Sequence, residues 1–139
     1  MDARQAMFAA LRSRLCNNAS LVAMVATRAI TVSLRKPPST YPAIRMRVVG
    51  ANGPTFDTFL GGDVYLNIYT KSNNPTAVLA SIYNVAHSLL HDKATAITTS
   101  NIGVGRIWEQ YVDYPQYEDD PGGIYYLGSR YSFTAQNRT

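Results

Sequence analysis

Two histidines, His87 and His91, are the residues whose type and spacing come closest to a chemical site. Residues four apart lie on one face of a helix, so this pair could share a metal ion. The H-E-x-x-H motif adds a glutamate as general base, whereas the sequence between these histidines is Ser-Leu-Leu. The chain has only these two histidines, so a carboxylate such as Asp92 would have to complete the site. A surface or interface pair is therefore favoured over a metal site.

Three further patterns fall short of a catalytic or cofactor site. Cys16 and His87 could be drawn as a nucleophile and its base, but Cys16 stands near the end of an amphipathic helix, which favours a buried thiol. Gly103-Val104-Gly105 lacks the spacing and helix start of a dinucleotide loop, and no P-loop occurs. The acidic residues at 118–120 fall in a turn-rich segment, which is typical of a solvated turn. The sequence thus predicts a protein that is not an enzyme and holds no metal or cofactor.

Charge is distributed unevenly along a chain whose net charge is +4. Basic residues gather early and acidic residues gather late, at Arg35, Lys36, Arg45, Arg47, Asp113, Glu118, Asp119 and Asp120. The basic group, together with ten tyrosines, could bind nucleic acid. Arginine and tyrosine are also frequent at protein interfaces. The interface interpretation is favoured, with the basic and acidic groups meeting between subunits.

One strand and one helix would position most of the candidate residues. Val64, Leu66 and Ile68 alternate with polar or aromatic residues and predict a strand with one buried face. The Asn-Asn-Pro sequence that ends at Pro75 predicts the start of a long helix over residues 74–91. The helix face opposite its apolar stripe carries only small uncharged residues, namely Ala77, Ala80, Ser81, Asn84 and Ser88. Such a face indicates either contact with another protein or a weakly polar surface in solvent, and both interpretations stay open.

The remaining segments complete an expected α+β fold in a single domain, residues 1–139. Residues 1–27 predict an N-terminal helical pair, residues 28–70 predict strands with a long loop at 50–62, and residues 102–135 predict a C-terminal strand pair with an acidic loop at 114–123. Short spacing between residues 30–34 and 43–49 predicts a hairpin. The expected architecture is a mostly antiparallel sheet of four to five strands with one long helix packed across it. The loop at 50–62 holds three large apolar residues that could contact a partner or fold back onto the core: Phe56, Phe59 and Leu60.

Composition indicates a globular protein made in a reducing compartment. The apolar fraction is 46%, and no segment approaches the roughly 20 apolar residues of a membrane helix. A single cysteine excludes an internal disulfide framework and fits the cytosol. No signal-peptide pattern is present. We therefore expect a cytosolic protein with no membrane partner.

The order of elements over nearly the whole chain resembles the tail-completion or tail-terminator proteins of long-tailed bacteriophages. The resemblance rests on pattern and order rather than on an invariant motif, and the loops at 50–62 and 114–123 are longer than the family leads us to expect. The segments that carry it are the helix at 3–15, the Asn-Ala-Ser-Leu-Val-Ala-Met-Val sequence at 18–25 with Arg-Ala-Ile at 28–30, Tyr-Pro-Ala-Ile at 41–44, the strand at 64–70 with the helix at 78–90 and His-Asp at 91–92, and the strands around Arg-Ile-Trp at 106–108 and Arg-Tyr-Ser-Phe at 130–133.

This resemblance implies a structural virion protein that assembles in the host cytoplasm into a ring, typically a hexamer, at the head-proximal end of the tail tube. Such a ring stops tube polymerisation and joins the tail to head-completion proteins, while DNA passes through the lumen without being read. Its partners would be further copies of itself, the major tail-tube protein and a head-completion or connector protein. Two alternatives stay open: a head-completion or adaptor protein between portal and tail, and a small nucleic-acid-binding module that uses the early basic residues.

Overall fold

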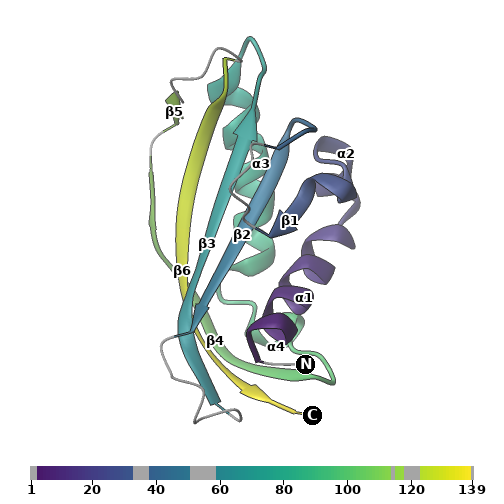
Figure 1. Ribbon diagram of the computed structural model, residues 1–139, viewed down its shortest axis with the longest axis vertical. Coiled ribbons are helices and arrows are strands. Elements are labelled where there is room, and N and C mark those ends of the chain that lie inside the picture. Colours follow the sequence, from purple (N-terminus) through teal and green to yellow (C-terminus); the bar gives the residue numbers. More distant parts are fainter. Residues whose placement is uncertain (1–2, 33–37, 51–58, 114, 118–122, 139) are drawn as a thin grey trace.

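The computed structural model describes residues 3–32, 38–50, 59–113, 115–117 and 123–138, with the side chains of residues 59, 60 and 137 left out. The chain is an α+β protein (Figure 1). Its elements in order are α1 (Ala3–Cys16), α2 (Ala19–Met24), the 3-10 turn η1 (Thr27–Ala29), β1 (Ile30–Val32), β2 (Ala43–Gly50), β3 (Phe59–Thr70), α3 (Pro75–Leu90), α4 (Ala94–Ile97), β4 (Ile102–Val112), β5 (Gln116–Tyr117) and β6 (Tyr125–Asn137).

The described strands form a six-stranded mixed sheet, ordered β1-β2-β3-β6-β4, with β5 also paired to β6. All neighbours are antiparallel except β1 and β2, which run parallel with Ile30 opposite Ile44. The expected hairpin between residues 30–34 and 43–49 is therefore wrong, and so is the count of four to five strands. Short spacing along the chain therefore does not by itself imply an antiparallel hairpin.

The helices cover one face of this sheet, where α1 and α3 lie side by side (Figure 1). The expected arrangement had one long helix across the sheet, but α1, with 14 residues, is nearly as long as α3, with 16. Burial of each leucine or isoleucine side chain between the layers contributes about 1.5–3 kcal/mol to the free energy of folding. The core between the layers is apolar and includes Met7, Leu11 and Leu15 from α1, Leu79, Ile82 and Leu90 from α3, and Val64, Leu66 and Ile68 from β3.

Strand β3 is longer than the sequence led us to expect. It begins at Phe59 and pairs with β6 along its full length, from Phe59 opposite Gln136 to Thr70 opposite Tyr125. The segment 59–62 was expected in a loop because it contains two glycines. Its backbone pairs with β6, so it belongs to the sheet. The rest of that loop, residues 51–58 with Phe56, lies outside the described residues, as do the side chains of Phe59 and Leu60.

Helix starts follow the predicted chemistry in part: α2 has its asparagine cap, whereas Asn74, at the start of α3, makes no side-chain capping hydrogen bond. The Asn18 side chain accepts a hydrogen bond from the Leu21 N–H at 2.9 Å and caps α2. Pro75 stands in the first turn of α3, where its missing N–H costs nothing. Across the described ranges, every helix is too short or too polar to cross a membrane.

Candidate functional site

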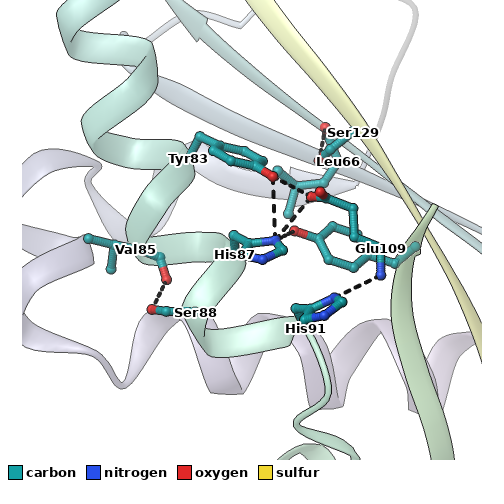
Figure 2. A network of polar contacts seen from close by, with 9 residues as sticks. Leu66, Tyr83, Val85, His87, Ser88, His91, Glu109 and Ser129 are labelled. Carbon is teal, nitrogen blue, oxygen red and sulfur yellow. Dashed lines mark hydrogen bonds and ion pairs between the residues drawn. The ribbon is translucent and has the colours of Figure 1, made fainter. Parts of the chain in front are cut away.

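A half-buried polar cluster joins α3 to the sheet at the edge strand β4. Glu109 of β4 extends its carboxylate toward α3, where Oε2 lies 2.5 Å from the Tyr83 hydroxyl and 3.0 Å from His87 Nδ1 (Figure 2). The Tyr131 hydroxyl of β6 lies 3.3 Å from the same histidine nitrogen. The cluster thus brings together residues from one helix and two strands.

The Glu109 carboxylate organises this cluster electrostatically. Its side chain is 15% exposed and receives the Tyr83 hydroxyl as a donor. Burial, then the hydrogen bond and the charge of Glu109, raise the pKa of Tyr83 well above its usual range. Burial, followed by the Glu109 charge, raises the pKa of Tyr131 in the same direction. Both phenols are therefore held as neutral hydrogen-bond donors around one carboxylate.

His91 is fixed differently, through the backbone of the same glutamate. The Glu109 N–H donates to His91 Nδ1 at 3.0 Å, so this nitrogen carries no proton and the neutral ring carries its proton on Nε2. The His91 ring also stacks on His87 at 4.7 Å and lies 4.2 Å from the Trp108 ring, measured between centroids. The histidine pair therefore links α3 to β4 from a half-buried position, and its expected role as a surface or interface pair stays a prediction.

This geometry disfavours metal chemistry at the pair. His91 could ligate only through Nε2, which already carries a proton while Nδ1 accepts the Glu109 N–H. Among the residues that the structure describes, no three His, Cys, Asp or Glu side chains gather as a metal site. Cys16 packs half-buried against the core, less buried than expected. The polar cluster accordingly reads as a connection between layers.

Sequence reasoning missed Tyr83, Glu109 and Tyr131. The signal that could have found the cluster is a period-2 pattern in β4, where Ile107 is buried and Glu109 follows on the same face. A carboxylate on a buried face needs partners, and a histidine on the covering helix is a natural one.

The small uncharged residues of α3 lie on its outer surface, opposite the apolar stripe, as the sequence predicted. Four of its small residues are exposed and Ala80 is half-exposed. The Ser81 hydroxyl donates to the Ala77 carbonyl at 2.9 Å, and the Ser88 hydroxyl donates to the Val85 carbonyl at 2.7 Å (Figure 2 shows the second). Because these hydroxyls are already bonded within the helix, covering this face would leave few polar groups without partners.

The charged residues expected at the subunit interface differ in how far they are exposed. Arg47 is exposed on β2, but Arg45, expected beside it on an outward face, is only 8% exposed. Its position faces away from the helices, yet neighbouring parts of the chain cover it, which alternation along one strand could not reveal. Asp113 is half-buried after β4, where its N–H donates to the Gly128 carbonyl. The other charged candidates lie outside the described residues: Arg35, Lys36, Glu118, Asp119 and Asp120.

Neither the family models nor the curated proteins include a match to this chain. Among solved structures, a chain in the virion of a native gene transfer agent (GTA) particle superposes with a TM-score of 0.70 at 14% identity. The two chains share a fold. The match covers 93% of each chain.

Proposed function

We propose that this chain is a structural virion protein that acts as a tail terminator. It would form a ring, hexameric in the resembled family, at the head-proximal end of the tail tube, after assembly in the host cytoplasm. The observation that supports this most is the likeness in fold, over 93% of the chain, to a component of the GTA virion. The order of elements along the sequence points to the same class independently.

The outer face of α3 is the surface we propose for contacts between subunits. A closed ring of identical subunits joins two different patches of each copy. The α3 face offers one such patch, because it is exposed, uncharged and internally hydrogen-bonded at Ser81 and Ser88. Charged residues are depleted at interface centres, which fits this composition.

The proposed partners are further copies of the chain, the major tail-tube protein and a head-completion or connector protein, with DNA passing through the lumen. We propose contact residues only for the interface between subunits of the ring. Residues 51–58 and 118–122, which could contact the other partners, lie outside the described part of the chain.

Purified protein added to polymerising tail-tube protein tests this role. A terminator should form discrete rings by mass photometry and should shorten the tubes seen by electron microscopy in proportion to its concentration. Rings that leave tube length unchanged but bind the portal would assign the chain to the alternative, a connector between portal and tail. Protein that neither forms rings nor caps tubes would overturn the proposal.

A further inference from the structure

The face of the sheet away from the helices carries a row of alternating arginines and tyrosines. The row crosses four neighbouring strands in register: Arg47 on β2 is opposite Tyr65 on β3, Tyr65 is opposite Arg130 on β6, and Arg130 is opposite Tyr111 on β4. The Arg47 guanidinium lies 4.7 Å from the Tyr65 ring centroid, and that of Arg130 lies 5.4 Å from the Tyr111 centroid. Each arginine is thus held over a ring by a cation–π contact.

Among the described residues, the charge on this face is mostly positive. Its described members include Arg106, which stacks over Trp108 at 5.6 Å, and the largely covered Arg45. The described carboxylates on this face are Asp63, which accepts the Ser132 hydroxyl at 2.9 Å, and the half-buried Asp113, whose N–H donates to the Gly128 carbonyl where the pairing of β4 with β6 continues. Within the described ranges, no carboxylate lies at ion-pair distance from Arg47, Arg106 or Arg130. The guanidinium groups therefore offer hydrogen-bond donors to an external acceptor.

Arg130 lies between Tyr65 and Tyr111 in this row of arginines and tyrosines. Its Nε is buried and has no hydrogen-bond partner among the described residues, although its ring contact with Tyr111 fixes the side chain. The buried Nε cannot itself reach an external ligand, so an oxyanion would be bound by the terminal amino groups of this fixed guanidinium, whose planar geometry suits phosphate.

We infer that this outer face of the sheet binds the phosphate backbone of double-stranded DNA without reading its sequence. Neighbouring strands are about 4.8 Å apart, so Arg47 and Arg130, two strands apart, can reach phosphates about 10 Å from each other. Arginine and tyrosine are also frequent at protein interfaces, so an acidic protein is the competing occupant, and the test below separates it from DNA. The inference rests on the face itself and applies to a single subunit as well as to a ring.

The test is fluorescence anisotropy of the full chain with two duplexes of equal length and unrelated sequence, over a range of salt concentrations. We expect equal affinity for both duplexes, with a dissociation constant of about 10⁻⁴ to 10⁻⁶ M near physiological salt. The plot of log affinity against log salt should have a slope of about −3 for three phosphate contacts. The double variant Arg47→Gln and Arg106→Gln, at two exposed positions, should reduce that slope by about 2.

A matched control separates the face from net charge. Arg4 and Arg28 are exposed in α1 and η1, on the helical side, so Arg4→Gln with Arg28→Gln removes the same charge elsewhere. An equal loss of binding in this control would overturn the inference, as would the lack of binding at low salt. Equal competition by polyglutamate would overturn it in favour of an acidic protein partner. Loss of ring assembly in the face variant would assign the face to a subunit contact instead, whereas intact rings that do not bind DNA would refute this inference and leave the proposed function standing.

Discussion

The carboxylate of Glu109 and Nδ1 of His87 lie 3.0 Å apart, across the junction between the edge strand β4 and α3. The same glutamate also donates its backbone N–H to His91. One residue of the sheet therefore holds two positions a turn apart at the C-terminal end of α3. This link fixes the end of the helix whose outer face we propose as a subunit contact.

Removing the charge of Glu109 should destabilise the protein. Glu109→Gln keeps the side-chain shape but replaces charged hydrogen bonds to Tyr83 and His87 with neutral ones. We expect the free energy of unfolding in urea to fall by about 1–3 kcal/mol. The exposed neighbour Gln110, changed to Ala, is the control and should alter it by less than about 0.5 kcal/mol. Equal effects at both positions would show that the cluster adds no stability.

The two phenols with raised pKa values, Tyr83 and Tyr131, predict a loss of stability in alkali. The raised pKa values of Tyr83 and Tyr131 mean that the native state keeps protons that the unfolded chain releases above about pH 10. Their contribution is therefore complete below pH 10, and the free energy of unfolding should fall as pH rises beyond it, by up to about 1.4 kcal/mol per pH unit for each phenol. Urea midpoints measured across this range test the slope. Tyr83→Phe should flatten it, whereas Tyr117→Phe at an exposed position should leave it unchanged.

Chelation should leave the protein unaffected. Because His91 Nδ1 accepts the Glu109 N–H, the histidine pair is satisfied without a metal ion. Thermal unfolding with and without EDTA should give the same midpoint. The double variant His87→Gln and His91→Gln should have a free energy of unfolding lower by about 1–3 kcal/mol, and hence a lower thermal midpoint, yet should still assemble. A chelator that lowers the midpoint of the unchanged protein but not of the variant would show a metal site.

Close approach of two strands makes Gly62 irreplaceable by alanine. A Cβ at this position would stand 1.9 Å from the Val49 carbonyl oxygen, which belongs to backbone and cannot rotate away. We expect Gly62→Ala to destabilise the fold by at least about 2 kcal/mol. Gly128→Ala is the control, because its Cβ would meet only the end of the Asn67 side chain. A smaller loss at position 62 than at 128 would contradict the observed pairing of β2 with β3.

Local sequence patterns correctly predicted the strands and the helix in which a regular apolar pattern extends over many residues. The alternation at Val64, Leu66 and Ile68 predicted the buried face of β3, and the C-terminal strand pair expected at 102–135 corresponds to β4 and β6. The apolar stripe of α3 and the antiparallel pairing of β4 with β6 were also predicted. These features depend on neighbours in the sequence, so a single sequence contains them.

Features that depend on distant segments were missed. The parallel direction of β1 against β2 does not follow from the spacing of the two strands, and the burial of Arg45 depends on the residues that cover the strand. The role of Glu109 appears only once α3 docks on β4, since its histidine partner is 22 positions away. The candidate residues at 35–36, 56 and 118–120 lie outside the described part of the chain, so their roles stay predictions.

The outer face of α3 gives the most direct test of the proposed ring. Ser81 is exposed, and its hydroxyl is bonded to the Ala77 carbonyl, so Ser81→Lys should change the stability of a single subunit by less than about 0.5 kcal/mol. In a ring that buries this face, the same lysine would bring a long, charged side chain into a surface of small residues and would have to lose much of its hydration. We therefore expect the concentration needed for ring assembly to rise at least about tenfold, which corresponds to 1.4 kcal/mol. Ala9→Lys, at an exposed position of α1, is the matched control and should leave assembly unchanged. Mass photometry over a concentration series measures both variants. If Ser81→Lys assembles as readily as Ala9→Lys, the small uncharged face of α3 is a solvated surface and the subunits meet elsewhere.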